Sequence, residues 1–235
     1  MQPRDRLIVA LDRSDRDEIL ALADSLSDAV GAFKVGLQAF VANGPSIVRE
    51  VAARGQVFLD LKLHDIPNTA SHAATEAGAL GVTLLTVHAS GGVAMMQACR
   101  AATAASTQLL GVTILTSLGE NDLGQIGFDG DPLRNAVRLA RLAMVAGLDG
   151  VVASPLEIEA IRNACGEAPL IVVPGIRSGG EPAADQRRTM TAAKAVALGA
   201  SYIVVGRPIT ASADPFAAAM RLVDEIGAAS GGPTS

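Results

Sequence analysis

The chain has 235 residues, of which 49% are apolar and 18% charged, and its formal net charge is −5. This length can bury a large core within one domain, whereas the acidic balance, the lack of tryptophan and the single tyrosine argue against a nucleic-acid-binding surface. Apolar runs end well before the roughly 20 residues that span a bilayer. The run at 7–11 is too short for a signal peptide, so we expect a soluble, cytoplasmic protein.

Two cysteines, Cys99 and Cys165, lie in alanine-rich, helix-like surroundings. We expect both to be small, reduced core residues, which suits a reducing compartment. The sequence has no Cys-x-x-Cys motif or Cys/His cluster, so it predicts no metal site.

Short apolar stretches alternate with amphipathic stretches along the chain, a pattern that predicts alternating strands and helices. The predicted strands cover 7–11, 32–36, 58–64, 82–87, 109–115, 150–153, 169–173 and 201–205. The predicted helices cover 15–27, 37–54 with an interruption at 43–45, 67–80, 92–105, 132–146, 155–164, 186–198 and 215–226. Residues 119–131 and 178–185 are rich in glycine and polar residues and predict loops, and 230–235 predicts a disordered tail.

The predicted strands are nearly continuous apolar runs, which is typical of a parallel sheet covered on both faces. Eight strand–helix units in a chain of this length predict a single α/β domain, a closed (β/α)8 TIM barrel over residues 1–229. An open, doubly wound sheet is the alternative. Against it, no Gly-x-Gly-x-x-Gly motif follows the first strand.

The third strand carries an unusual set of charges, Asp60, Lys62 and Asp65, among alternating leucines. Residues two apart on a strand share a face, so Asp60 and Lys62 are predicted to point the same way. Because charges are costly to bury unless they pair, this set is either a structural ion pair or a catalytic array. In the structural alternative, Asp65 caps a helix that begins at Pro67.

Polar residues also lie at or near the carboxyl ends of most of the other predicted strands, and in a TIM barrel the active site lies at these ends. They are Asp12, Lys34, Asp60 with Lys62, His88, Thr116 with Ser117, Arg177 and Arg207. The presence of polar residues at nearly every predicted strand end predicts an enzyme. Gly-Ile-Arg at 175–177 and Gly-Arg at 206–207 follow the last two strands, where phosphates often bind in this fold, and Gln186 could add a donor.

The segment at 60–69, Asp-Leu-Lys-Leu-His-Asp-Ile-Pro-Asn-Thr, resembles the signature of the orotidine 5′-phosphate decarboxylase family. Further stretches resemble family motifs in the same order, at 10–12, 34–36, 87–89, 115–117, 174–177, 185–186 and 204–207. The chain departs from the family pattern at Ala192, where relatives often have proline, and this concerns a helix start rather than a catalytic residue.

The resemblance implies decarboxylation of orotidine 5′-phosphate to UMP in pyrimidine biosynthesis, with no metal or organic cofactor. It implies that Lys62 donates a proton to C6, that Asp60 and Asp65 flank this lysine, and that Lys34 belongs to the same array. It implies substrate contacts from Asp12, Lys34, Asp60, Thr69, Thr116, Ser117, Arg177, Gln186, Gly206 and Arg207.

The resemblance also implies a homodimer in which Asp65 and Thr69 reach into the partner's site, and a supporting role for His88. Three alternatives remain open. The first is a magnesium-dependent phosphosugar decarboxylase of the same barrel superfamily, such as one that acts on 3-keto-gulonate 6-phosphate. The second is a Schiff-base aldolase that uses Lys34 or Lys62, and the third is a barrel that binds a phosphate ligand without catalysis. The continuation Ile-Pro-Asn-Thr at 66–69 favours the orotidylate enzyme.

Overall fold

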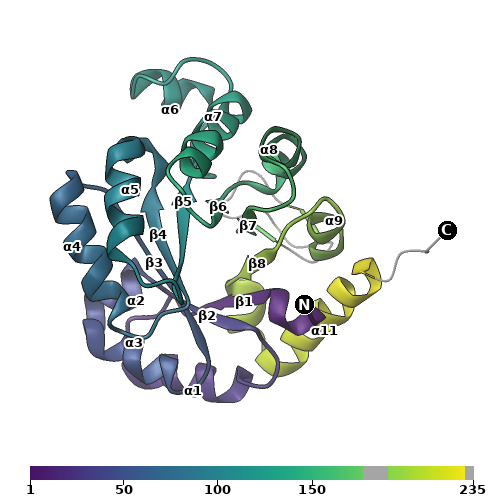
Figure 1. Ribbon diagram of the computed structural model, residues 1–235. Coiled ribbons are helices and arrows are strands. Elements are labelled where there is room, and N and C mark those ends of the chain that lie inside the picture. The colour runs from purple at the N-terminus through teal and green to yellow at the C-terminus, as the bar shows by residue number, and fades with distance from the viewer. Residues whose placement is uncertain (177–189, 231–235) are drawn as a thin grey trace.

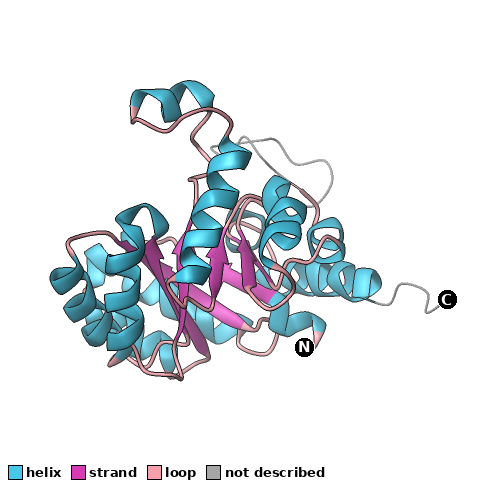
Figure 2. Ribbon diagram, turned by 45° about the horizontal axis from the view of Figure 1, so that its top comes forward, coloured by secondary structure: helices cyan, strands magenta, loops and turns pink. Residues whose placement is uncertain are grey.

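Eight parallel strands form a closed barrel in the order β1 to β8, and β8 pairs with β1. The computed structural model describes residues 1–176 and 190–230. Figures 1 and 2 show the strands at the centre and the helices around them. The strands are β1 Leu7–Ala10, β2 Ala32–Gly36, β3 Gln56–Leu63, β4 Leu84–His88, β5 Gln108–Val112, β6 Gly150–Val152, β7 Leu170–Val173 and β8 Tyr202–Val205. The predicted (β/α)8 barrel is confirmed.

Helices connect the successive strands. They are α1 Arg16–Leu26, α2 Leu37–Asn43, α3 Pro45–Ala52, α4 Pro67–Gly78, α5 Gly92–Ala102, α6 Glu120–Gln125, α7 Pro132–Val145, α8 Ile158–Cys165, α9 Ala192–Ala197, α10 Arg207–Thr210 and α11 Pro215–Ser230. Within the described residues, the short 3-10 helices are η1 Pro3–Arg6, η2 Ala89–Gly91 and η3 Pro155–Glu157. The interruption predicted at 43–45 is confirmed, since Gly44 has a φ of 66° between α2 and α3.

The alternation of side chains along each strand divides the core into two layers. One buried cluster fills the barrel interior and includes Ile8, Phe58, Leu84 and Val204. The larger cluster lies between the barrel and the surrounding helices. Cys99 is buried in this larger cluster and the half-buried Cys165 packs against it, both as free thiols, as predicted.

Several predicted elements differ from the structure. The predicted strand at 109–115 ends at Val112, the predicted helix at 155–164 begins with the 3-10 turn η3, and the last predicted helix, 215–226, continues to Ser230, the first residue of the predicted tail. The predicted loop at 119–131 contains the short helix α6, whose start is stabilised because the Gly119 backbone N–H donates to the Asp122 carboxylate at 2.8 Å. The predicted helix at 186–198 begins only at Ala192, where Thr191 is the N-cap and its hydroxyl accepts from the Lys194 backbone N–H. Three predicted segments lie outside the described residues. They are the first part of the predicted helix, at 186–189, the predicted loop at 178–185, and the predicted tail at 231–235.

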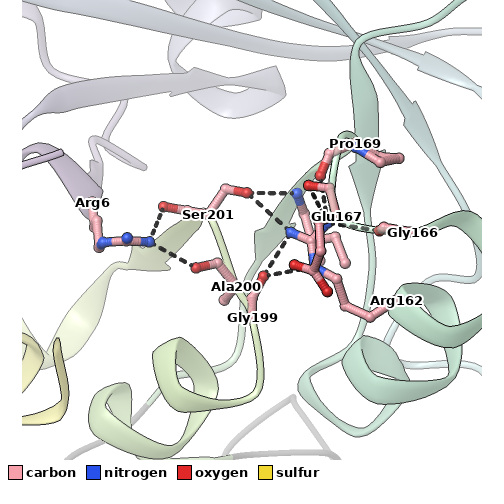
Figure 3. A network of polar contacts seen from close by, with 9 residues as sticks. Arg6, Arg162, Gly166, Glu167, Pro169, Gly199, Ala200 and Ser201 are labelled. Carbon is pink, nitrogen blue, oxygen red and sulfur yellow. Dashed lines mark hydrogen bonds and ion pairs between the residues drawn. The ribbon is translucent and has the colours of Figure 1, made fainter. Parts of the chain in front are cut away.

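Arginine side chains hold the loops at the amino ends of β7 and β8 together (Figure 3). The Arg162 guanidinium donates to the backbone carbonyls of Gly166, Glu167, Pro169 and Gly199. Arg6 donates to the carbonyls of Ala200 and Ser201. These contacts satisfy loop carbonyls at the base of the barrel, the end opposite to the one where TIM-barrel chemistry takes place.

Candidate active site

A cavity of about 570 Å³ lies at the carboxyl ends of the strands. Seven of the predicted site residues line it, namely Asp12, Lys34, Asp60, Lys62, Thr116, Gly206 and Arg207. Its apolar lining includes Phe58 from β3 and Val204 from β8, which also belong to the barrel interior. The barrel therefore supplies a cavity with an apolar part and a charged side built by β1, β2 and β3.

Four charged side chains in this cavity form a chain of alternating sign. Lys34 Nζ lies 2.9 Å from Asp12 Oδ1 and 3.8 Å from Asp60 Oδ2, and Lys62 Nζ lies 2.8 Å from the same Asp60 oxygen. Asp60 is only 9% exposed. Because this carboxylate faces two ammonium groups, the cost of burying it is offset within the array, which presents Lys62 to the cavity.

Gly36, at the end of β2, leaves the room that the Asp12–Lys34 contact needs. A Cβ atom at this position would lie 2.8 Å from Lys34 Nζ and 3.0 Å from Asp12 Oδ1. A methyl group here would have to displace the end of the lysine side chain rather than the backbone.

Gly36→Ala should therefore lower kcat/KM by roughly 10- to 100-fold, because it moves Lys34 away from its place in the array. The melting temperature should change little, since φ at Gly36 is −96° and suits alanine. Steady-state kinetics and thermal unfolding measure the two effects. Gly78→Ala in α4 is the matched control, because a Cβ there meets nothing within 4 Å, and it should leave activity unchanged. Wild-type kinetics for Gly36→Ala would contradict this reasoning.

The backbone at Lys62 departs from a regular strand. Among the described residues, Lys62 is the only non-glycine residue with positive φ, at 54°. The pairing of β3 with β4 shifts between Leu59 and Leu63, so β3 contains an irregularity at this point. The prediction that Asp60 and Lys62 point the same way is confirmed by their contact, although simple strand alternation does not describe the segment.

His88 lies half-buried at the end of β4, and its ring centroid is 5.3 Å from that of His64. Burial is the main cause that lowers the pKa of His88 below the usual 6.5. The nearby His64 and Lys62 lower this pKa further, and Asp60 raises it. His88 is therefore neutral at neutral pH and adds no positive charge beside Lys62.

Some predicted site residues are not in the cavity. Asp65, Thr69 and Ser117 are exposed and do not line it. The alternative in which Asp65 caps α4 is wrong, because Ile66 occupies the N-cap position and the Asp65 carboxylate accepts a hydrogen bond from the Ile66 backbone N–H at 2.7 Å. Arg177 and Gln186 lie outside the described residues.

The model of the orotidine 5′-phosphate decarboxylase / HUMPS family matches residues 5–222. The chain belongs to this family. An orotidine 5′-phosphate decarboxylase of Moorella thermoacetica is 50% identical over 236 residues, covering 96% of this chain and 94% of that protein. One of Trichlorobacter lovleyi is 48% identical and covers 96% of both chains. The crystal structure of the Lactobacillus acidophilus orotidine 5′-phosphate decarboxylase has a TM-score of 0.81 and 35% identity, and covers 94% of this chain and 98% of its own.

Sequence reasoning missed three polar residues that line the cavity of this family member, namely Arg13, Gln38 and Thr210. Arg13 directly follows Asp12, and its guanidinium donates to the Thr210 carbonyl at 3.0 Å, which links the end of β1 to α10. Gln38 in α2 donates to the Ser14 hydroxyl at 3.1 Å. Arg13 and Gln38 each lie two residues beyond the end of a predicted strand, at 11 and 36, which is the signal that could have identified them.

Within the described residues, no group of three or more His, Cys, Asp or Glu side chains is placed to hold a metal ion. Over the same residues, no helix is both long and apolar enough to cross a membrane.

Proposed function

We propose that this protein decarboxylates orotidine 5′-phosphate to UMP, with Lys62 as the proton donor to C6 and without a metal ion or organic cofactor. Relatives with this name match nearly the whole chain. The observation that carries the mechanism is the Asp12–Lys34–Asp60–Lys62 array on the wall of the cavity.

The reaction breaks the bond between C6 and the carboxylate carbon and leaves the electron pair on C6 as CO2 departs. The Lys62 ammonium stabilises this developing negative charge, an effect of several kcal/mol when the charge is preorganised. The same ammonium then transfers a proton to C6 and regains one from water. Asp60, which holds Lys62 at 2.8 Å, also lies where it can face the substrate carboxylate before CO2 leaves.

The remaining contacts follow the exits of the other strands. Asp12 and Lys34 bind the ribose hydroxyls, and Thr116 with Ser117 lies near the edge of the pyrimidine. Gly206 and Arg207 hold the phosphate, together with Gln186 and Arg177. Support for the phosphate end comes from Gly206 and Arg207, which line the cavity on the opposite side of β1 from Lys34.

The active unit is a homodimer in which Asp65 and Thr69 complete the partner's site. Both residues are exposed and outside the cavity of their own chain. Large apolar side chains are exposed nearby. Ile66, next to Asp65, is 66% exposed, and Leu37, which directly follows the neighbouring strand β2, is 53% exposed. Apolar exposure at the mouth of the barrel fits a surface that a second copy covers.

Mixing two inactive variants tests this arrangement. Lys62→Ala and Asp65→Asn should each be nearly inactive, whereas refolding an equal mixture should restore about a quarter of wild-type activity, because half of the dimers then contain one intact site. Activity is followed after the subunits have exchanged. A mixture no more active than its components would show that Asp65 serves its own subunit.

The function itself is tested by the loss of orotidine 5′-phosphate absorbance with EDTA-treated protein. We expect rapid conversion to UMP that added Mg²⁺ does not increase. Conversion only of 3-keto-gulonate 6-phosphate, and only with Mg²⁺, would indicate the phosphosugar decarboxylase instead. Covalent trapping of substrate by borohydride would indicate a Schiff base at Lys34 or Lys62. Tight nucleotide binding without turnover would indicate a binding protein.

We place the reaction in the cytoplasm. The two cysteines support this assignment, because Cys99 and Cys165 are free thiols in the structure and suit a reducing compartment.

A further inference from the structure

Thr86 is a polar residue in the middle of strand β4, between Leu85 and Val87, and it is completely buried. Leu84, two residues earlier, belongs to the cluster that fills the barrel interior, whereas Leu85 belongs to the outer layer. Thr86 therefore faces the barrel interior, on the same side as Leu84 and His88. A buried hydroxyl requires hydrogen-bond partners, and both partners of Thr86 belong to the proposed catalytic array.

The Thr86 hydroxyl bridges Asp60 and Lys62. Its oxygen accepts a hydrogen bond from the Lys62 backbone N–H at 2.9 Å and lies 3.0 Å from Asp60 Oδ1. Because a backbone N–H can only donate, the single hydroxyl proton of Thr86 is directed to the Asp60 carboxylate. Asp60 is thus held by Thr86 through Oδ1 while Oδ2 faces the two ammonium groups.

The second hydrogen bond supports the unusual backbone at Lys62. Where β3 and β4 lose their register between Leu59 and Leu63, the Lys62 N–H finds the Thr86 side chain as its acceptor. A non-glycine residue with φ of 54° is strained by about 1–3 kcal/mol and persists only where its surroundings hold it. Thr86 is one of the groups that hold it.

We propose that Thr86 is a positioning residue for catalysis, which locks the Lys62 backbone and the Asp60 carboxylate in the one arrangement that directs the Lys62 ammonium at C6. This inference rests on the decarboxylation mechanism proposed above. It assigns Thr86 no contact with the substrate. Its loss should therefore affect the chemical step more than binding.

The test compares Thr86→Val, which keeps the shape but removes the hydroxyl, with Thr86→Ser, which keeps the hydroxyl. Thr86→Val should lower kcat by roughly 100-fold, since a catalytic group displaced by about 1 Å costs about that factor. The KM for orotidine 5′-phosphate and the Kd for UMP should each stay within about threefold, and Thr86→Ser should restore kcat to within about fivefold of wild type.

Thr107→Val is the matched control for the loss of a buried hydroxyl. Thr107 is 3% exposed and donates to the Val82 carbonyl at 2.9 Å, at the amino end of β5 and away from the cavity. This variant should lose stability but keep kcat. A kcat for Thr86→Val no lower than that of Thr107→Val, or equal losses for Thr86→Val and Thr86→Ser, would overturn the proposal.

Thr86→Ala covers the case in which valine prevents folding, because it removes the same hydroxyl without adding a methyl group against Asp60. The proposal requires the same drop in kcat relative to Thr86→Ser. Assays of the wild-type protein and of Lys62→Ala in parallel distinguish a failure of the proposed function from a failure of the role proposed for Thr86. Inactive wild type would refute the proposed function, whereas active wild type, inactive Lys62→Ala and an active Thr86→Ala would refute only the role of Thr86.

Discussion

Lys62→Ala should lower kcat by roughly 10⁴-fold or more. The substitution removes a general acid, worth about 10²–10⁴-fold, together with a preorganised positive charge, worth about 10²–10³-fold. The protein should still fold, because Lys34 Nζ stays 3.8 Å from Asp60 Oδ2 and continues to compensate the buried carboxylate. Product formation measures the first effect, and circular dichroism with thermal unfolding measures the second.

Lys194→Ala is the control for losing a lysine, because Lys194 is exposed in α9 and distant in sequence from the array. Its kcat should equal that of wild type. Decarboxylation by Lys62→Ala at a rate near that of wild type would remove Lys62 from the role of proton donor and would favour Lys34 as the group to test next.

Arg207→Ala should lower kcat/KM for orotidine 5′-phosphate by roughly 10²–10⁴-fold, since it removes a guanidinium that can hold the phosphate by two hydrogen bonds. Arg207 is exposed at the start of α10 and lines the cavity, so the free energy of unfolding should change far less than the activity. Kinetics with the complete substrate and with orotidine, which lacks the phosphate, measure the effect.

The comparison of the two substrates makes this prediction specific. With orotidine, Arg207→Ala and wild type should have similar kcat/KM, because the lost contact has no counterpart in that substrate. Arg221→Ala, an exposed position on α11, should match wild type with both substrates. An equal loss on orotidine and on its phosphate would mean that Arg207 supports the structure of the site rather than the phosphate.

The barrel and most of the charged site could be predicted from the sequence because both depend on local patterns. Apolar runs mark the strands. Asp12 and Arg207 lie just beyond such runs, and Lys34 lies within one. The start of α9 also has a local signal that the predicted helix at 186–198 did not use, namely Thr191, which is the N-cap and accepts from the Lys194 backbone N–H.

The positions that shape the array were missed for another reason. Gly36 matters because Asp12 and Lys34 meet beside it, and Thr86 matters because β3 loses register with β4. Each depends on contacts between strands. One local signal was present for Thr86, namely a hydroxyl between two apolar residues, two residues before His88 and on the same face.

The left-handed backbone at Lys62 has an evolutionary consequence. Glycine adopts φ of 54° without strain, so Lys62→Gly should relieve about 1–3 kcal/mol while it removes the proton donor. Where this relief exceeds the loss of the Lys62–Asp60 ion pair, a directed-evolution campaign that selects only for heat resistance enriches inactive protein at this codon. Libraries built on this barrel need growth without added uracil or uridine as a second selection, so that the variants recovered still make UMP.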